Sequence, residues 1–428
     1  MRALILGGGG RESALAWALS RSRLVSELVA APGNAGISSF ATTLRVATED
    51  ASAVVALAKE LRPGLVVVGP EAPLVAGVGD ALRAEGFNVF GPGAGAARIE
   101  GSKAYAKELM ERAGIGTARG RSFDSMPEAV SFMDELGPPY VIKADGLAAG
   151  KGVVVTEDRD RAIAAIEERI ESGVFGAAGR TIVVEEFLDG QELSLIAVSD
   201  GRSVVACEPA QDYKRINDDD TGPNTGGMGS YSPVPACPPS LAEEIVAEMI
   251  EPMVAATAQA GAPFSGALYA GLALTSKGPR VVEFNVRFGD PETQALIPRL
   301  QSDFGEVCLA CATGDLGGSK LDWSPEACVS VVLASRGYPG EYSTGLEIRG
   351  IGAASQRRGV HVFHAGTVSE DRRLLTAGGR VLAVSALGDT FAEARKRAYD
   401  AARLIEFRGK HVRTDIALRA EHAERAES

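Results

Sequence analysis

The sequence predicts a multidomain protein that combines the α/β and α+β classes: an N-terminal doubly wound parallel sheet, a central region, and a C-terminal α+β domain. Three observations support this fold class. At 428 residues the chain is long enough for two to four domains of roughly 100–200 residues each. Predicted strands and helices alternate over the N-terminal region, which is typical of a parallel sheet. Beyond Trp323-Ser324-Pro325, short strands with glycine-containing turns indicate a separate α+β domain.

Composition and charge limit the class of function. The apolar fraction of 45% supports a sizeable core, and the net charge of −12 without a long basic run argues against a nucleic-acid partner. The N-terminus lacks a signal-peptide pattern, and no apolar run is long enough to span a membrane. Five cysteines without disulfide-like spacing suit a reducing compartment, so we expect a cytoplasmic protein that does not bind membranes.

The first strand and helix predict a phosphate site. Residues 3–6 are expected to form a strand, Gly7-Gly8-Gly9-Gly10 a turn, and residues 11–19 a helix, a layout that directs backbone N–H groups at an anion. This is not a dinucleotide fingerprint, because Glu12 occupies the third glycine position and no acidic residue follows the second strand, residues 28–31. A tight strand–helix turn without a ligand remains the alternative.

The rest of this N-terminal domain, residues 1–100, continues the alternation of strands and helices. Loops that follow its strands are expected at the carboxyl edge of the sheet, where ligands bind. The predicted elements are a helix over 50–61, a strand over 65–68, a loop over 69–73, a helix over 74–85 and a strand over 88–90.

The central region begins with helices and a glycine-rich hairpin. Ser102 is predicted to cap a helix that runs to about Arg112, and a second helix follows Pro127. In residues 140–155 two β-rich runs flank a glycine-rich loop, which predicts a hairpin. It is not a Walker A loop, because Gly152 replaces Ser or Thr and a strand follows. Lysines beside the loop suit a lid over polyphosphate, with a solvent-exposed hairpin as the alternative.

Residues 211–229 form a polar, glycine-rich segment. We expect a long structureless loop with a functional role, because permissive glycines and charges of both signs suit a zwitterionic or phosphorylated ligand. Its acidic run, Asp218–Asp220, is alternatively a solvated loop tip. The neighbouring predicted elements are a helix over 158–171, a strand, acidic hinge and second strand over 181–194, a helix over 239–260 and a strand over 267–274.

The predicted strand over residues 281–287 carries the strongest chemical signal. Side chains alternate between the faces of a strand, so Glu283, Asn285 and Arg287 share one face, opposite an apolar one. A carboxylate and an amide oxygen two residues apart suit Mg²⁺ that also holds a substrate phosphate. The alternative is a half-exposed strand with ordinary polar positions.

Two further patterns receive structural interpretations. Cys308 and Cys311 lie in an apolar helical run with no second pair at zinc spacing, which favours core cysteines over a metal or redox site. His361 and His364 differ in strand parity, so they are not expected to share a ligand. A helix is predicted over 390–405, and about the last ten residues are expected to fray.

Four features follow one another in an order that resembles the ATP-grasp fold. They are Lys103 on its capped helix, the Lys143 glycine-loop hairpin, the Glu185–Glu192 hinge and Glu283-x-Asn285. Further segments, which this fold in general does not require, are similar to the phosphoribosylamine–glycine ligase family, also called glycinamide ribonucleotide synthetases. These segments are Gln211-Asp212-Tyr213-Lys214-Arg215, Thr221–Gly229 and Asn285–Gln294, and the similarity extends over essentially the whole chain.

The resemblance implies a role for each candidate site residue. For ATP it implies Lys103 and Lys143 at the phosphates, Glu185 and Leu188 at the adenine, and Glu192 at the ribose. Mg²⁺ or Mn²⁺ is implied at Glu283 and Asn285, and catalytic roles are implied for Lys143 and Arg287. The implied substrate-binding residues are Gly9, Gly10, Arg11 and Glu12 for 5-phosphoribosylamine, and Asp212, Lys214 and Asp290 near glycine.

The resemblance also implies domains and partners. An ATP-grasp region is expected over residues 101–325, with 120–190 as a mobile lid, followed by the C-terminal α+β domain over 326–428. The implied partners are glycine and 5-phosphoribosylamine, without nucleic acid or membrane, and the protein is expected to be a monomer or a weak homo-oligomer.

The chain departs from the family at several positions. The family usually has His where this chain has Ser13 and Tyr213, glycine where it has Asn217, and glycine or lysine where it has Asp219. Many ATP-grasp relatives carry a further acidic metal ligand at about the place of Ala270. This last departure affects the details of metal coordination, not the reaction.

The implied reaction is ATP-driven amide formation in purine biosynthesis. The γ-phosphoryl group moves onto the carboxylate of glycine, and the amine of 5-phosphoribosylamine then attacks the glycyl phosphate to give glycinamide ribonucleotide, ADP and phosphate. Two alternatives remain. One is another ATP-grasp ligase or carboxylase, which would differ in residues 211–229, and the other is a non-catalytic nucleotide-binding regulator.

Overall fold

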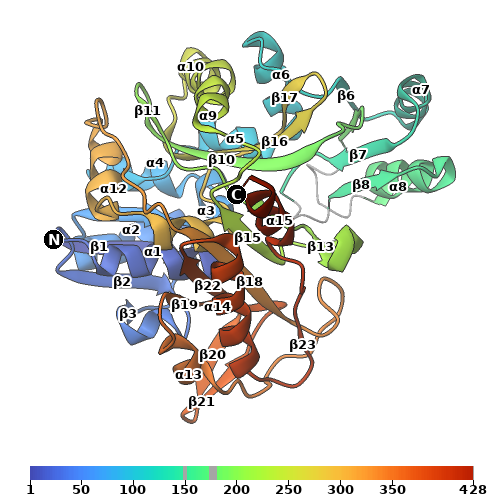
Figure 1. The fold of residues 1–428 in the computed structure, drawn as a ribbon. Helices are drawn as coiled ribbons and strands as arrows, with labels where there is room; N and C mark the ends of the chain where they lie inside the picture. Colours follow the sequence, from blue (N-terminus) through green and yellow to red (C-terminus); the bar gives the residue numbers. More distant parts are fainter. Residues whose placement is uncertain (148–151, 173–180, 428) are drawn as a thin grey trace.

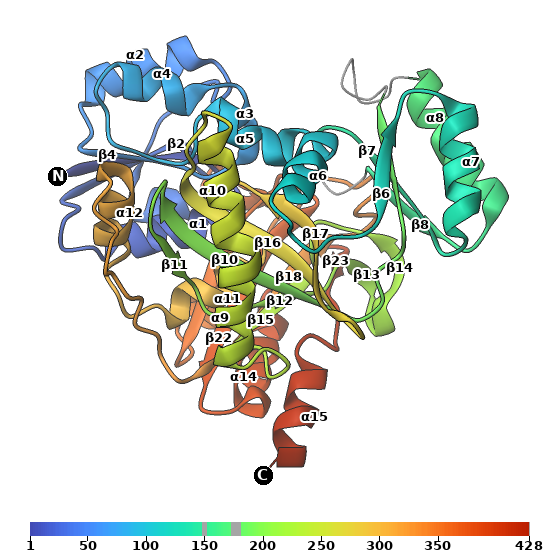
Figure 2. The ribbon, with the colours of Figure 1, turned by 90° about the horizontal axis from the view of Figure 1, so that it is seen from above.

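The N-terminal residues form the predicted doubly wound parallel sheet. The computed structural model describes residues 1–147, 152–172 and 181–427. Five parallel strands run in the order β3-β2-β1-β4-β5. Figure 1 shows β3, β2 and β1 of this sheet side by side, and Figure 2 shows α2 and α4 on one face and α1 on the other. The elements are β1 (Arg2–Gly7), α1 (Gly10–Ser20), β2 (Glu27–Pro32), β3 (Thr42–Thr43), α2 (Ala51–Leu61), β4 (Leu65–Val68) and β5 (Val89–Phe90).

The helix predicted over 74–85 is wrong in detail. The structure has two short helices, α3 (Glu71–Val75) and α4 (Val78–Ala84), which meet at Gly77. Gly77 has a φ of +83°, a conformation that a side chain disfavours and that interrupts the hydrogen-bond ladder of a helix. A further helix that was not predicted, α5 (Ala94–Gly101), leads into the central region.

A peripheral lobe projects from the rest of the molecule (Figure 2). Its antiparallel sheet has the order β6-β9-β7-β8 and packs α7 and α8 around a separate core that includes Met133, Ile142 and Ile166. The predicted β7–β8 hairpin is confirmed, although residues 148–151 of its loop lie outside the described residues. The elements are β6 (Gly120–Phe123), α7 (Met126–Leu136), β7 (Tyr140–Ala144), β8 (Val153–Thr156), α8 (Arg159–Ser172) and β9 (Ile182–Glu185).

A second antiparallel sheet, β11-β10-β16-β17, carries the strand that the sequence singled out. β17 ends at Asn285, not at 287, and a bulge separates the Gly271–Glu283 and Leu272–Val281 pairs. The predicted helix over 239–260 is present, interrupted by a π-helical segment. The elements are α6 (Lys103–Arg112), β10 (Gln191–Asp200), β11 (Val204–Ala206), α9 (Pro239–Ile245), the π-helix (Val246–Ile250), α10 (Glu251–Gln259), β16 (Ser265–Thr275) and β17 (Gly278–Asn285).

Residues 211–232 are structured, which corrects the expectation of a structureless loop. Within this segment β13 and β14 form a small antiparallel hairpin, while β15 pairs with β18 of the C-terminal sheet. Backbone pairing therefore ties the polar segment to a part of the chain more distant in sequence. The elements are β12 (Gln211–Asp212), β13 (Arg215–Asn217), β14 (Thr221–Asn224) and β15 (Gly229–Ser232).

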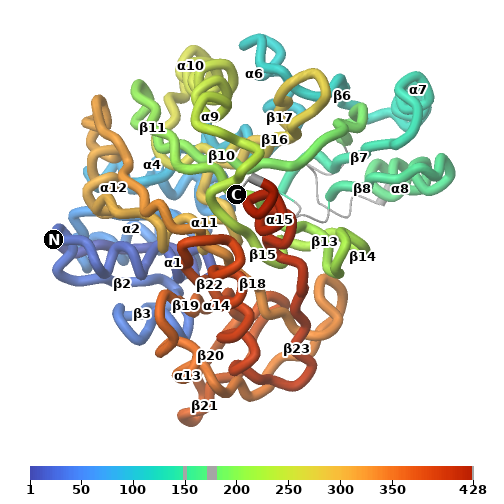
Figure 3. Tube along the Cα trace, viewed as in Figure 1, coloured from blue at the N-terminus to red at the C-terminus, as the bar shows by residue number. Residues whose placement is uncertain are grey.

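The C-terminal region combines antiparallel strands with helices, as predicted. Its main sheet has the order β12-β15-β18-β22-β19, and α14 packs on β18 and β22. The C-terminal residues expected to fray instead form α15, in which Ala420 is buried (Figure 3). The elements are α11 (Glu292–Leu296), α12 (Phe304–Thr313), β18 (Ala327–Ser335), α13 (Ile351–Ser355), β19 (Val360–His364), β20 (Thr367–Glu370), β21 (Arg373–Thr376), β22 (Arg380–Gly388), α14 (Phe391–Leu404), β23 (Lys410–His411) and α15 (Leu418–Glu427).

No helix within the described ranges of the chain has both the length and the apolar character that a membrane span requires.

Candidate functional site

Glu283 and Asn285 lie at the end of β17 with their oxygens uncommitted. Among the described residues, none donates a hydrogen bond to either side chain. Burial alone would raise the pKa of Glu283, but nearby lysines, chiefly Lys214 and Lys103, hold it below its ordinary value. The carboxylate is therefore ionised at neutral pH and surrounded by positive charge.

These two side chains fit a hard divalent cation. Mg²⁺ in nucleotide sites commonly takes one or two protein oxygens and completes its shell with phosphate and water. The residue across the ladder from Glu283 is Gly271, whereas Ala270 pairs with Phe284. Neither Gly271 nor Ala270 has an oxygen-bearing side chain, so neither can supply a further metal ligand.

Lys143 and Glu185 meet in a buried ion pair. The Lys143 Nζ lies 2.5 Å from Glu185 Oε2, and Lys107 Nζ lies 2.9 Å from Glu185 Oε1. Burial would raise the pKa of Glu185, but Lys143 and Lys107 outweigh it and lower that pKa. Lys107 was not identified from sequence, although its spacing of four from Lys103 places both on one helix face.

Lys143 also connects the peripheral lobe to the strand of the predicted metal residues. Its Nζ donates to the Val282 carbonyl oxygen at 3.1 Å, directly before Glu283. Lys103 lies at the start of α6 and donates to the Gly146 carbonyl oxygen at 3.3 Å. The residues predicted to contact ATP phosphates thus border the described part of the glycine loop and β17.

The predicted adenosine residues lie between the lobe and the second sheet. Leu188 is half-buried in the segment that joins β9 to β10. Glu192, near the start of β10, forms an ion pair with Lys214. The third predicted adenosine residue, Glu185, lies at the end of β9, and its carboxylate forms ion pairs with both Lys107 and Lys143.

Asp212 and Lys214 belong to a group of charged side chains around Glu283. Burial raises the pKa of Asp212 to about 8, although the positive charge of Lys214 opposes this shift. Carboxylates including Asp212 and Glu192 raise the pKa of Lys214 well above its usual value, although burial opposes them. Asp212 and Glu283 influence each other's proton affinity, so the predicted glycine-side and metal-side residues are neighbours.

Glu292 contributes a buried carboxylate that the sequence interpretation did not assign. The Ser194 hydroxyl donates to Glu292 Oε1 at 3.0 Å and lies 2.8 Å from the Tyr269 hydroxyl. All three side chains are buried. The only sequence signal for Glu292 is its place in Gly289-Asp290-Pro291-Glu292, directly after the strand.

Arg287 is held between two carboxylates from the N-terminal region. Its Nη2 lies 2.9 Å from Glu100 Oε1 and its Nε lies 3.3 Å from Glu71 Oε2. Burial would lower the pKa of Arg287, but Glu100 and Glu71 raise it, so the guanidinium stays charged. Glu100 also accepts the Val286 N–H at 2.7 Å. Glu71 lies in the predicted carboxyl-edge loop, whereas Glu100 lies in the unpredicted α5.

The glycine turn before α1 is capped by carboxylates of the protein itself. The Gly9 N–H donates to Glu12 Oε2 at 2.7 Å, and the Arg11 N–H donates to Asp290 Oδ2 at 3.2 Å. A Cβ added to Gly10 would lie 2.5 Å from the Gln294 amide nitrogen. Two of the N–H groups predicted to face a phosphate thus donate their hydrogen bonds to carboxylates of the protein.

The side chains of Arg11 and Asp290 extend this arrangement. The Arg11 guanidinium donates to the Phe288 carbonyl oxygen at 3.2 Å and lies 3.8 Å from Glu71. Asp290 lies 3.3 Å from Arg380, and although burial would raise the pKa of Asp290, Arg380 and Arg11 lower it. Five predicted substrate-binding residues therefore lie together: Gly9, Gly10, Arg11, Glu12 and Asp290. Arg287 lies beside them, because Glu71 contacts both Arg11 and Arg287.

Ser13 and Tyr213 both bond to the C-terminal region. The Ser13 hydroxyl accepts the His364 N–H at 3.1 Å, and the Tyr213 hydroxyl accepts the Ala417 N–H at 2.9 Å. These two departures from the family pattern thus lie in contacts between regions of the chain.

The cysteine and histidine patterns have packing roles. Cys308 and Cys311 are buried, and the Cys311 thiol, whose pKa burial raises to about 12, donates to the Ser199 carbonyl oxygen. The His361 ring packs on Trp17, while His364 Nδ1 lies 3.0 Å from the Thr367 hydroxyl. Within the described residues, no group of three or more His, Cys, Asp and Glu side chains could hold a metal.

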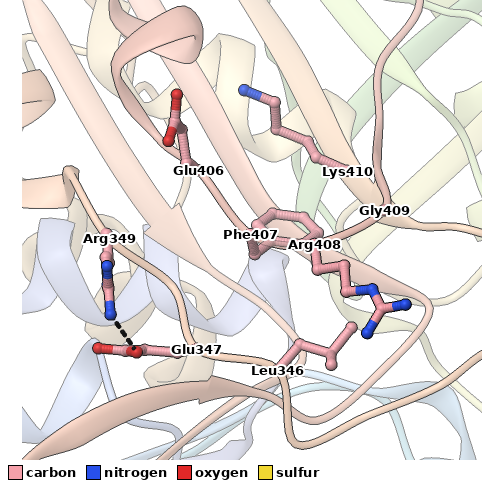
Figure 4. A pocket seen from close by; sticks show the side chains of 8 residues that line it. All are labelled: Leu346, Glu347, Arg349, Glu406, Phe407, Arg408, Gly409 and Lys410. Atoms are coloured by element: carbon pink, nitrogen blue, oxygen red, sulfur yellow. Dashed lines mark hydrogen bonds and ion pairs between the residues drawn. The ribbon is translucent and has the colours of Figure 1, made fainter.

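An open cavity of about 620 Å³ lies elsewhere, on the C-terminal region (Figure 4). Its Arg349 pairs with Glu347, and its Lys410 donates to the carbonyl oxygens of Ala402 and Ile405 at the end of α14. None of the predicted site residues lines it. The lining residues are Leu346, Glu347, Arg349, Glu406, Phe407, Arg408, Gly409 and Lys410.

Comparison with protein families finds matches along most of the chain. Models of the phosphoribosylglycinamide synthetase N domain, ATP-grasp (A) domain and C domain match residues 1–100, 101–293 and 328–419.

Individual proteins give the same picture. The chain is 48% identical over 426 residues to a phosphoribosylamine–glycine ligase of Agrobacterium fabrum, covering 100% of both chains. It is 51% identical over 423 residues to the enzyme of that name from Streptomyces coelicolor, covering 98% of this chain and 99% of the relative.

Solved structures are similar over the same extent. A phosphoribosylamine–glycine ligase of Thermotoga maritima superposes with a TM-score of 0.84 at 36% identity, covering 97% of this chain and 100% of that one. A biotin carboxylase of Campylobacter jejuni superposes with a TM-score of 0.74 at 13% identity, covering 96% and 92%, which indicates a shared fold alone.

Proposed function

The chain belongs to the phosphoribosylglycinamide synthetase family, and we propose on that basis that it joins glycine to 5-phosphoribosylamine with ATP. It is an ATP-grasp ligase that forms a C–N bond. The proposed products are glycinamide ribonucleotide, ADP and phosphate, the corresponding step of purine biosynthesis.

One observation carries most of this proposal. Lys143 donates to the carbonyl of Val282, next to Glu283 on β17, while Arg287 follows the same strand. The lysine proposed to bind phosphate therefore lies beside the strand that carries the proposed metal-binding oxygens, and the guanidinium of Arg287 follows that strand. Phosphoryl transfer requires mainly this kind of positioning and charge neutralisation.

The first step activates glycine. A carboxylate is a poor electrophile, so one of its oxygens attacks the γ-phosphorus of ATP, forming a P–O bond and breaking the β–γ bridge to release ADP. Lys103 and Lys143 neutralise the phosphate oxygens, and Arg287, fixed by Glu71 and Glu100, orients the reacting group. When bound at Glu283 and Asn285, Mg²⁺ or Mn²⁺ supplies further positive charge to the phosphates.

The second step forms the amide. The amine of 5-phosphoribosylamine attacks the carbonyl carbon of glycyl phosphate, phosphate leaves, and the nitrogen loses a proton. We assign Gly9, Gly10, Arg11 and Glu12 to the phosphoribosylamine side, and Asp212, Lys214 and Asp290 to the glycine side. The contact of Asp290 with the Arg11 N–H supports the placement of the two substrates next to each other.

The adenosine of ATP is assigned to the hinge between the lobe and the second sheet. Leu188 and Glu192 are proposed to contact the adenine and the ribose, respectively. For Glu185 we retain a place at the adenine, with the added role of holding Lys143 through their ion pair.

The proposed binding roles are assigned to successive domains along the chain. Residues 1–100 serve phosphoribosylamine, 101–325 serve ATP and glycine with 120–190 as a lid, and 326–428 form the C-terminal domain. The glycine-rich loop proposed as a lid over polyphosphate includes residues 148–151, which lie outside the described residues. We further propose a cytoplasmic protein that is monomeric or weakly associated.

The experiment that tests the proposed function compares acceptors of the phosphoryl group. ADP release is measured with ATP, Mg²⁺ and phosphoribosylamine, adding either glycine or bicarbonate. We expect release with glycine and none above background with bicarbonate. Release that requires bicarbonate would identify a carboxylase instead, and no release with either would identify a nucleotide-binding regulator.

A further inference from the structure

The segment that carries Asp212 and Lys214 is held from behind by the C-terminal end of the chain. Contacts join β23 and the start of α15 to β13 and the residues directly after it, although these parts are distant in sequence. Hydrogen bonds join residues within 411–419 to Tyr213, Arg215, Ile216 and the acidic run Asp218–Asp220. We call this set of contacts the C-terminal latch.

Arg413 is the centre of the latch. It is 1% exposed, and its guanidinium stacks 4.8 Å from the centre of the Tyr213 ring. Nη1 donates to the Arg215 carbonyl oxygen and to Asp220 Oδ1, both at 3.0 Å. The other side of its planar fork donates to both carboxylate oxygens of Asp415, at 2.8 and 2.6 Å. A guanidinium presents donors in this fork, and a lysine cannot.

Neighbouring contacts extend the grip on either side of Arg413. His411 Nε2 lies 2.8 Å from the Ile216 carbonyl oxygen, and the Thr414 N–H donates to Asp218 Oδ1 at 2.7 Å. The Asp219 N–H donates to Asp415 Oδ2 at 3.0 Å, and Arg419 donates to Asp220 at 2.9 Å. The acidic run that the sequence left open as a solvated loop tip is thus a partner of the latch.

Backbone conformation on both sides of the latch indicates that its geometry is imposed. Asp219 and Asp220 have φ values of +56° and +51°, and Ala417 has a φ of +60°. Non-glycine residues rarely adopt this left-handed region, and they persist there when their surroundings fix them. The Tyr213 hydroxyl accepts a hydrogen bond from the Ala417 N–H, so a residue with this unusual conformation makes a latch contact.

The latch and the site occupy opposite sides of the same short segment. Tyr213 points to Arg413 and Ala417, whereas Asp212 and Lys214, on either side of it, belong to the charged group around Glu283 and Glu192. Fixing Tyr213 and the Arg215 carbonyl therefore fixes the backbone from which Lys214 extends.

We infer that Arg413 is a positioning residue for the reaction, acting through Tyr213 and the Arg215 carbonyl to hold Asp212 and Lys214 in the site. This inference rests on the proposed function, in which Asp212 and Lys214 serve glycine. Arg413 itself is not assigned any contact with a substrate.

The test is Arg413→Lys, with Arg425→Lys on the exposed part of α15 as the matched control. We expect Arg413→Lys to raise the KM for glycine at least about tenfold, while the dissociation constant for ADP changes less than about twofold. The control should leave both unchanged. A purely structural role would lower the melting temperature and the active fraction without changing the KM for glycine, and that result would overturn the inference.

A second variant keeps the test decisive if Arg413→Lys does not fold. Asp220→Asn weakens the same grip at a side chain that is 40% exposed, and should raise the KM for glycine by a smaller factor in the same direction. An unchanged KM in this variant would contradict the inference.

A wild-type chain without glycine-dependent ADP release would overturn the proposed function instead. Hydrogen exchange separates the two cases, because loss of the latch should speed exchange of the amides of 211–217 in Arg413→Lys but not in Arg425→Lys. Equal exchange in both variants would overturn the latch itself.

Discussion

Lys143 and Glu185 form a buried ion pair, with Nζ 2.5 Å from Oε2, and neither side chain is more than 8% exposed. The pair joins β7 to β9 inside the lobe, and Lys107 from α6 completes it. A carboxylate buried among two ammonium groups stabilises the fold only while both remain charged. The lysine proposed to bind phosphate is therefore fixed by the protein before ATP arrives.

Replacement of Lys107 should destabilise this arrangement. In Lys107→Met, Glu185 keeps a single cation, and disrupting a buried ionic group costs about 3 kcal/mol. We expect a melting temperature several degrees below that of wild type at pH 7, measured by thermal unfolding. The pair of Lys59 with Glu85 is exposed, so Lys59→Met should change the free energy of unfolding by less than about 1 kcal/mol.

The same variant should respond to pH in a defined direction. The pKa of Glu185 is lowered in the folded chain, so its stabilising contribution is present above the unfolded pKa of about 4.3 and is lost as pH falls through the folded value. The difference between wild type and Lys107→Met should therefore shrink below about pH 4. A difference that stays constant or grows in acid would contradict the assignment.

Removal of the Glu283 carboxylate should abolish catalysis with little effect on the fold. Because no described residue donates a hydrogen bond to this side chain, Glu283→Ala leaves no hydrogen-bond donor without its partner. We expect ADP formation to fall at least about 100-fold and the melting temperature to change by only a few degrees. The exposed Glu243→Ala serves as the control, and near-normal turnover in Glu283→Ala would remove the metal assignment.

Arg287→Lys should reduce turnover more than substrate binding. A lysine keeps the charge but cannot contact Glu100 and Glu71 at once through a planar fork. We expect kcat to fall about 100-fold with little change in the KM for ATP, measured by steady-state ADP release. Arg280→Lys, on β17 shortly before Arg287, should leave kcat unchanged. Equal values for the two variants would exclude a role for Arg287 in the reaction.

The titration of Asp212 should appear in the stability of the protein. Its pKa is raised to about 8 in the folded chain, against about 4 when unfolded. A carboxyl shifted in this direction contributes most stability below pH 4, and that contribution is lost as pH rises towards 8. Asn cannot titrate, so the melting temperature of Asp212→Asn relative to wild type should rise between pH 5 and pH 8.

The exposed Asp124→Asn is the control for this measurement, with a difference from wild type that should not depend on pH. A difference for Asp212→Asn that stays flat over the same range would show that the Asp212 carboxyl titrates near its ordinary value.

Local patterns in the sequence predicted elements well where local chemistry decides them. Ser102 caps α6 as expected, accepting the Tyr105 N–H at 3.1 Å. The β1 strand, the glycine turn and α1 were predicted from their apolar run and glycines, and the family resemblance correctly predicted the fold class. The capped helix, the strand and the glycine turn each depend on residues within a few positions of one another.

Features that depend on distant partners could not be predicted from the sequence alone. The segment 211–229 looked structureless because its partners, β18 and residues 411–419, lie far along the chain. The bulge in β17 arises from pairing with β16, and alternation within one strand contains no sign of it. Arg413 illustrates the limit, because its neighbours in sequence give no hint of Tyr213 or Asp220.

Omission of substrates one at a time tests directly whether this chain joins glycine to 5-phosphoribosylamine. The purified chain is supplied with ATP, Mg²⁺, glycine and freshly formed 5-phosphoribosylamine, and both ADP and glycinamide ribonucleotide are quantified. We expect equal amounts of the two products in the complete mixture and no glycinamide ribonucleotide when glycine or phosphoribosylamine is left out. Full ADP release without glycine, or a complete mixture that yields ADP but no glycinamide ribonucleotide, would contradict it.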